Sequence, residues 1–150
     1  AAPINVQIST DRKEYRDGDK VKIFIRGNKP FYARVLYKDA SGSLLQLLPN
    51  PYSTDNYFNG GTVYEIPSGS DRFDIEVSPP YGEESVTIYA STAPLGDLSL
   101  QAEGGEYHIK TKQKDIGNKT RGIKLKERET GKTSYSSEFF EEKASLKTGK

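Results

Sequence analysis

Leu44-Leu45-Gln46-Leu47-Leu48-Pro49-Asn50-Pro51-Tyr52 decides the fold class, together with the loop Asp55-Asn56-Tyr57-Phe58-Asn59-Gly60-Gly61 and the return Val63-Tyr64-Glu65-Ile66-Pro67. The four leucines predict a buried strand. Pro-Asn-Pro ends that strand, because proline has no N–H for a sheet and fixes its own φ. Asn-Gly-Gly supplies residues that tolerate positive φ, as a tight return into a second strand often requires. The stretch predicts two strands and a loop, with no group that indicates chemistry.

Alternation of apolar and polar residues, the pattern of strands with one buried face, recurs on both sides of this stretch. It predicts further strands over 4–8, 21–26, 31–37, 73–77 and 86–91.

Turn residues separate these strands. Asp17-Gly18 and the sequence 39–42 predict tight turns, the second as a hairpin into the leucine strand. The stiff link Ser78-Pro79-Pro80-Tyr81-Gly82 favours placing its two flanking strands in different sheets. Together, about seven to nine short strands predict an all-β, immunoglobulin-like antiparallel β-sandwich, without the Cys…Trp…Cys core of antibody domains.

Length and composition fit a single domain over 1–150 whose core comes from half-buried strands. The chain has 150 residues, of which 33% are hydrophobic, and no apolar window approaches the roughly 18 residues of a membrane span. It has no cysteine, which excludes disulfides, thiolate zinc sites and cysteine nucleophiles.

Charge is distributed unevenly along the chain. From Lys112 onward there are 11 Lys and Arg against 6 Asp and Glu, whereas residues 1–111 hold 11 against 15. A basic tail can bind nucleic acid or an anionic surface. Here the lysines alternate with glutamates, so a solvated polar surface is the better interpretation and no nucleic-acid partner is expected.

The opening Ala1-Ala2-Pro3, in a sequence without methionine, is typical of a chain from which a secretory signal has been removed. A trimmed boundary explains it equally well. We expect an exported protein, periplasmic, outer-membrane-associated or extracellular.

The segment 96–150 forms a polar C-terminal extension. A hairpin around Gly104-Gly105 is predicted from 97–102 and 107–111, and 122–126 alternates once more. Residues 112–120 contain one apolar side chain, Ile116, and predict a mobile loop.

Two structures compete for the end of the chain. Phe139, Phe140, Lys143 and Ala144 fall at helical spacing behind two serines that could cap a short helix. A terminal strand through 144–148 is the alternative.

The sequence contains few candidates for catalytic or metal-binding groups, and each has a simpler interpretation. His108, the single histidine, is flanked by Tyr107 and Ile109 in a predicted strand, which favours an edge-strand residue over a triad base. Asp17-Gly18-Asp19 lacks the further ligands of a calcium loop. Glu83 and Glu84 are adjacent in a strand, so they point to opposite faces and do not resemble a glycosidase pair. We expect no catalytic residue, no metal and no cofactor.

Aromatic residues are the remaining candidates for a binding surface. The chain has ten tyrosines and six phenylalanines, and Tyr52, Tyr57, Phe58 and Tyr81 lie in predicted loops. On a rigid sandwich they could form a stacking platform for a sugar or anchors for a protein partner. Alternatively, they close the open end of the core.

The order of several short motifs resembles one known family. The motifs are Tyr15-Arg16-Asp17-Gly18-Asp19-Lys20-Val21, Ala33 to Tyr37 with Asp39 and Gly42, Leu47-Leu48-Pro49-Asn50-Pro51-Tyr52 with Asp55-Asn56, Gly61-Thr62 with Ile66-Pro67, and Pro79-Pro80-Tyr81-Gly82-Glu83-Glu84. Over about residues 4–95 this succession resembles the bacterial domain-of-unknown-function family 4384. The resemblance implies an immunoglobulin-like domain in exported or envelope-associated bacterial proteins, and it brings no catalytic residues.

From these observations we expect a non-catalytic interaction or architectural module of an exported bacterial protein, with a protein or cell-envelope component as its partner. A glycan or cell-wall binding module that uses the loop aromatics is the first alternative, and an enzyme of unrecognised type is the second.

Overall fold

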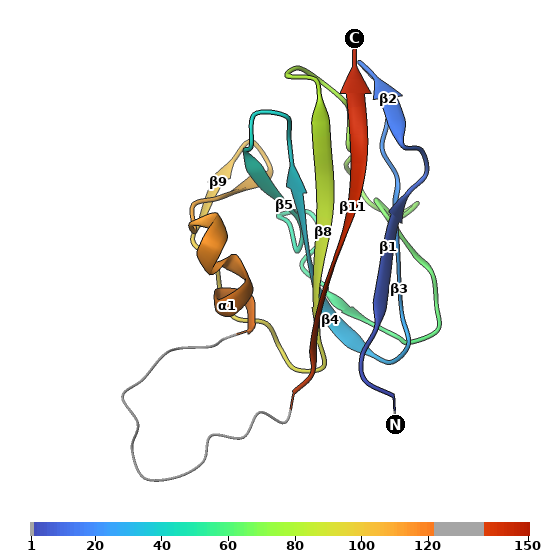
Figure 1. Cartoon of the computed structure of the whole chain (residues 1–150), viewed down its shortest axis with the longest axis vertical. Helices are drawn as coiled ribbons and strands as arrows, with labels where there is room; N and C mark the ends of the chain where they lie inside the picture. Colours follow the sequence, from blue (N-terminus) through green and yellow to red (C-terminus); the bar gives the residue numbers. More distant parts are fainter. Residues whose placement is uncertain (1, 122–136) are drawn as a thin grey trace.

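The computed structural model of the chain describes residues 2–121 and 137–150 (Figure 1). In chain order its elements are β1 (Val6–Thr10), β2 (Glu14–Arg16), β3 (Ile23–Gly27), β4 (Phe31–Lys38), β5 (Leu44–Leu48), β6 (Tyr57–Phe58), β7 (Tyr64–Ile66), β8 (Glu83–Ser91), β9 (Leu100–Glu103), β10 (Glu106–Ile109), the 3-10 turn η1 (Gln113–Asp115), α1 (Ile116–Arg121) and β11 (Phe139–Gly149). No helix within these two ranges is long and apolar enough to cross a membrane.

The strands form two sheets of unequal width that pack as a β-sandwich, which confirms the predicted fold class. The smaller sheet has the order β1-β3-β7, and the larger has the order β2-β11-β8-β4-β5-β10-β9, with β6 paired to β4. The described residues hold eleven strands, more than the predicted seven to nine, because β2 and β6 are too short to show alternation. The pairing is antiparallel except between β2 and β11, which run parallel.

Most buried side chains of the main core are those that the alternating patterns placed on one face. The main core lies between the two sheets. Most of its fully buried residues come from β1, β3, β4 and β8: Val6, Ile23, Ile25, Phe31, Ala33, Val35, Val86, Ile88 and Ala90. The two-residue period of a strand therefore predicted the core directly.

The leucine strand β5 is half-buried rather than buried, which corrects the prediction. Leu44, Leu45 and Leu47 are partly exposed, whereas Gln46 and Leu48 are buried. The reason is the position of β5 in the larger sheet, beyond the central pair β8 and β4 and toward the β9 edge.

Residues 73–77 form an extended segment rather than the predicted strand. A single bridge joins Lys20 to Glu76. The N–H of Val21 donates to the carbonyl of Ile75, and the N–H of Val77 donates to the carbonyl of Asp19, each at 2.8 Å. Because residues 19–21 lead into β3, the segment continues the β7 edge of the smaller sheet. The link 78–82 then crosses to β8 in the larger sheet, as predicted.

The C-terminal part departs most from the predictions. The β9–β10 hairpin is confirmed. The expected loop over 112–120 is wrong, because η1 and α1 form there and Ile116 is buried. A short helix does form in the C-terminal extension, as α1, but not at the alternative position near Phe139. The alternative terminal strand is correct but longer, and β11 lies between β8 and β2 (Figure 1). The alternating segment 122–126 lies outside the described residues.

A second, smaller core covers the outer face of the larger sheet. Leu36 and Tyr89 pack there with Leu98 and Ile116, which belong to the segment that follows β8. Figure 1 shows α1 on this side of the sandwich.

Arg34 ties α1 to the sheet beside this second core. Its guanidinium is buried and donates to three neutral oxygens: Gln46 Oε1 at 2.9 Å, Thr120 Oγ1 at 2.7 Å and the carbonyl of Gly96 at 2.8 Å. Burial lowers the pKa of Arg34 from its ordinary value, since desolvation disfavours the charged form. Because an unpaired buried charge is costly, the stability of this arrangement depends on each of the three acceptors.

Replacing Thr120 by valine should therefore destabilise the domain. Thr120→Val keeps the shape but leaves one N–H of Arg34 without its acceptor, which costs about 1–3 kcal/mol of unfolding free energy. Urea unfolding followed by circular dichroism measures this loss. Thr62→Val, at an exposed position, is the matched control and should change stability by no more than about 0.5 kcal/mol. Equal effects of the two changes would contradict the assigned role of Arg34.

Truncating Leu146 tests whether β11 is an integral part of the sandwich. Leu146 is 2% exposed within the main core, so Leu146→Ala should lower the unfolding free energy by about 2–5 kcal/mol. Lys143→Ala, on an exposed position of the same strand, should have little effect in the same urea titration. A loss below about 1 kcal/mol for Leu146→Ala would show that β11 is dispensable.

Candidate functional site

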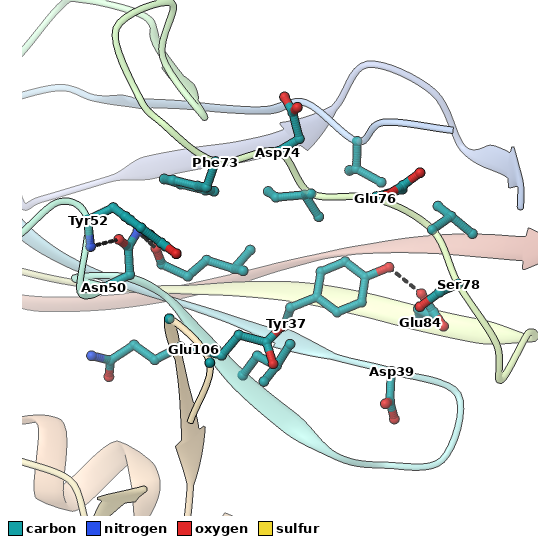
Figure 2. A pocket seen from close by; sticks show the side chains of 18 of the residues that line it. Tyr37, Asp39, Asn50, Tyr52, Phe73, Asp74, Glu76, Ser78, Glu84 and Glu106 are labelled. Carbon is teal, nitrogen blue, oxygen red and sulfur yellow. Dashed lines mark hydrogen bonds between the residues drawn. The ribbon is translucent and has the colours of Figure 1, made fainter. Parts of the chain in front are cut away.

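A cavity of about 360 Å³ opens between β4–β5 of the larger sheet and the extended segment 73–80 opposite (Figure 2). The turn between β9 and β10 contributes to its wall. Its lining residues are Val21, Tyr37, Asp39, Leu45, Gln46, Leu47, Asn50, Tyr52, Phe73, Asp74, Ile75, Glu76, Val77, Ser78, Pro79, Pro80, Glu84, Gly104, Gly105 and Glu106. This volume lies within the range of about 300–1,000 Å³ that is typical of ligand pockets.

Tyr52 and Phe73 form an aromatic pair in the wall of the cavity. Their ring centroids are 6.1 Å apart and the ring planes differ by 22°. Tyr52 remains 57% exposed, so its ring is available for contact. Such a surface offers large, stiff contact area to a ligand at low entropic cost.

The loop that carries Tyr52 is held by Asn50. Its Oδ1 accepts the N–H groups of Tyr52 at 2.7 Å and Ser53 at 2.9 Å, and its Nδ2 donates to the carbonyl of Leu47 at 2.6 Å. This is an Asx turn, in which a side chain replaces backbone hydrogen bonds. The Pro-Asn-Pro motif that ends β5 thereby also positions Tyr52.

Gly105 permits the close packing of Tyr52 against the β9–β10 turn. A Cβ atom at this position would lie 2.9 Å from the Cε2 and Cζ atoms of the Tyr52 ring, and its φ is +81°. Glycine is therefore required here by space and by backbone conformation.

Tyr37 and Glu84 form a buried polar pair within the cavity (Figure 2). The Tyr37 hydroxyl donates to Glu84 Oε1, and the N–H of Ala40 donates to Oε2 at 3.2 Å. Burial, followed by the hydrogen bond to Glu84, raises the pKa of Tyr37 above its ordinary value. Both oxygens of Glu84 have partners, so this carboxylate anchors β4, β8 and the hairpin turn together.

The lining carries five carboxylates and no lysine, arginine or histidine: Asp39, Asp74, Glu76, Glu84 and Glu106. An acidic, partly enclosed surface attracts cationic groups. Among residues 2–121 and 137–150, no group of three or more His, Cys, Asp or Glu could hold a metal ion.

Most of these carboxylates already have structural partners. Asp74 lies 3.3 Å from Lys20, and Glu106 lies 3.2 Å from His108. Asp39 Oδ1 accepts the N–H of Ser41 at 2.9 Å within the hairpin turn. Together with Glu76 and Glu84 they make the rim of the cavity acidic.

The four aromatic residues predicted from the sequence occupy different environments. Tyr52 lines the cavity, whereas the other three do not. Tyr57 packs against Tyr32 with a centroid distance of 4.6 Å. Phe58 packs between two aromatic rings, 5.5 Å from Phe31 and 4.7 Å from Tyr64.

Tyr81 is held at a separate turn. Its hydroxyl donates to Asp17 Oδ1 at 2.7 Å. In the same turn Gly18 has a φ of +83°, and Asp19 Oδ2 accepts the N–H of Arg16 at 2.7 Å. The carboxylates of Asp17 and Asp19 thus accept hydrogen bonds from Tyr81 and from the backbone of the turn.

Three residues of the site were not predicted from the sequence. Phe73 was placed in a strand, Tyr37 in the core, and Glu84 was considered only beside Glu83, which is exposed and lies 3.7 Å from Lys147. The available signal was the alternation of 73–77, which put an aromatic ring on an inward face next to acidic residues.

The pH dependence of stability tests the pair formed by Tyr37 and Glu84. Because the pKa of Tyr37 is raised in the folded state, its contribution to stability is fully present below the ordinary value of 10.0. Above that value the contribution declines, because the unfolded chain releases the Tyr37 proton while the folded chain keeps it. Above pH 10.5 the unfolding free energy of Tyr37→Phe should therefore fall less steeply than that of the wild type, by about 1.4 kcal/mol per pH unit. Urea midpoints between pH 7 and 11.5 measure it.

The same variant should also be less stable at pH 7, because Glu84 loses a buried donor. Identical slopes above pH 10.5 in the two proteins would contradict the assignment.

Comparison with known proteins yields one match. A family model described as a domain of unknown function, DUF4384, matches residues 14–94. No curated protein and no solved structure matches the chain.

Proposed function

This chain belongs to the DUF4384 family, and we propose that it is a non-catalytic module of an exported bacterial protein that binds a protein partner through the cavity. The cavity is the single observation on which the proposal rests. It combines an exposed aromatic residue, Tyr52, with aliphatic side chains and an acidic rim. Protein interfaces use aromatic anchors surrounded by polar groups in this way.

The state of the polar groups supports binding over catalysis. Four of the five lining carboxylates, all but Glu76, are engaged in hydrogen bonds or ion pairs within the domain. His108 is paired with Glu106 and is not among the lining residues. Structural contacts therefore occupy these carboxylates, which favours binding over covalent catalysis, because catalysis needs a base that is free to activate a nucleophile.

The exposed ring of Tyr52 also favours a second candidate, a glycan or cell-wall binding module. Stacking of a sugar ring on Tyr52 would use the same aromatic surface. The acidic rim favours a basic polypeptide instead, since neutral sugars gain nothing from a negative field.

Two probes separate these candidates. The immobilised domain is offered a phage-displayed library of random 12-residue peptides and, separately, purified peptidoglycan sacculi. We expect enrichment of peptides whose binding falls about tenfold or more in Tyr52→Ala, since a central aromatic anchor contributes at least ~2 kcal/mol. Titration calorimetry with the enriched peptides measures the change.

Tyr57→Ala is the matched control, because Tyr57 is similarly exposed but lies outside the cavity. It should leave peptide affinity unchanged. Retention of sacculi that is lost in Tyr52→Ala would favour the glycan module. Enriched peptides that bind Tyr52→Ala as well as the wild type would refute a role for the cavity.

A further inference from the structure

The smaller sheet leaves part of the larger sheet uncovered. It ends at β7 and the segment 73–77, whereas the larger sheet continues past β4 to β5, β10 and β9. Leu45 and Leu47 on β5 consequently line the cavity and remain partly exposed. In a sandwich of matched sheets, a strand of the opposite layer would cover such residues.

The segment 73–77 presents a free backbone edge at this uncovered position. The hydrogen bonds of Ile75 and Val77 point toward residues 19–21. In extended backbone the groups of the intervening residues point the opposite way. No hydrogen bond from the N–H of Asp74 or Glu76 is present among the described residues. An unpaired edge of this kind is a template for another strand.

The side chains of the edge define what an added strand would carry. Phe73, Ile75 and Val77 point inward, as their burial shows, and Asp74 and Glu76 are exposed on the outer face. Side chains of adjacent strands meet on the same face, and opposite charges there are favourable. Apolar residues of a new strand would face Leu45 and Leu47, and alternate basic residues would lie beside the two carboxylates.

We propose that an extended segment of a partner protein adds to the edge 73–77 as a β-strand, with apolar side chains in the cavity alternating with lysine or arginine side chains outside it. This inference rests on the proposed function, because it specifies how the same cavity is occupied. The acidic lining supports a basic segment in particular, and it disfavours pairing with an acidic edge of a second copy.

The peptides enriched on the domain test the inference through their backbone. Each peptide is synthesised as a series with one N-methyl group moved along it. Methylation should weaken binding about tenfold at every second position and much less between, because only alternate N–H groups of an added strand face the edge.

Amide hydrogen exchange gives a second measurement on the same complexes. The N–H groups of Asp74 and Glu76 should become protected when the peptide is bound, while that of Val63, which lies outside the cavity, should not change. Glu76→Lys should weaken binding about tenfold, with Glu103→Lys on β9, outside the cavity lining, as the matched charge reversal.

The outcomes distinguish the two levels of the proposal. Peptides that need Tyr52 but show no period-two effect of methylation and no protection of Asp74 or Glu76 would overturn strand addition and leave the binding module intact. Failure to enrich any peptide that depends on Tyr52 would overturn both. An alternating methylation profile with protected amides at positions 74 and 76 would establish strand addition.

Discussion

Burial of β4 on both of its faces is the constraint on which the rest of the structure depends. One face supplies Phe31, Ala33 and Val35 to the core between the sheets, and the other presents Arg34 and Leu36. A strand with two buried faces needs a layer on each side. The smaller sheet forms one layer, and Leu98 together with α1 forms the other.

The two layers have different energetic requirements. The core between the sheets is apolar and stabilised by removal of aliphatic and aromatic surface from water. The outer layer is attached through a buried guanidinium, whose three neutral acceptors must all be present. This explains why Gln46 stands in a run of leucines: its side-chain oxygen accepts a hydrogen bond from the buried guanidinium of Arg34.

The sequence predicted what depends on local pattern. Period-two alternation identified the residues of β1, β3, β4 and β8 that form the core, and turn residues located the hairpin at Asp39. It did not predict long-range pairing, such as the place of β11 between β8 and β2, because alternation says which face is buried but not which strand lies alongside. The helix α1 was not predicted, because Ile116 is its only buried apolar residue and a single residue cannot show a helical period.

The candidate site was predicted only in part, for a similar reason. Tyr52 was identified because it follows a proline-rich loop, and loops carry binding residues. Phe73 and Glu84 come from distant parts of the chain, and they line one cavity only because the sheets differ in width. The difference in width between the two sheets arises from the long-range pairing of strands, which a local sequence pattern does not predict.

The position of β11 also sets the order in which the domain can assemble during synthesis. The N–H of Ile4 donates to the Glu138 carboxylate, 134 residues away, and the last residues of β11 pair with β2 near the start. Contacts this distant in sequence make folding slow. Until Gly149 has left the ribosome, the exposed edges of β2 and β8 have no neighbour between them. The domain therefore stays incomplete, and open to chaperones, until β11 has been synthesised and released from the ribosome.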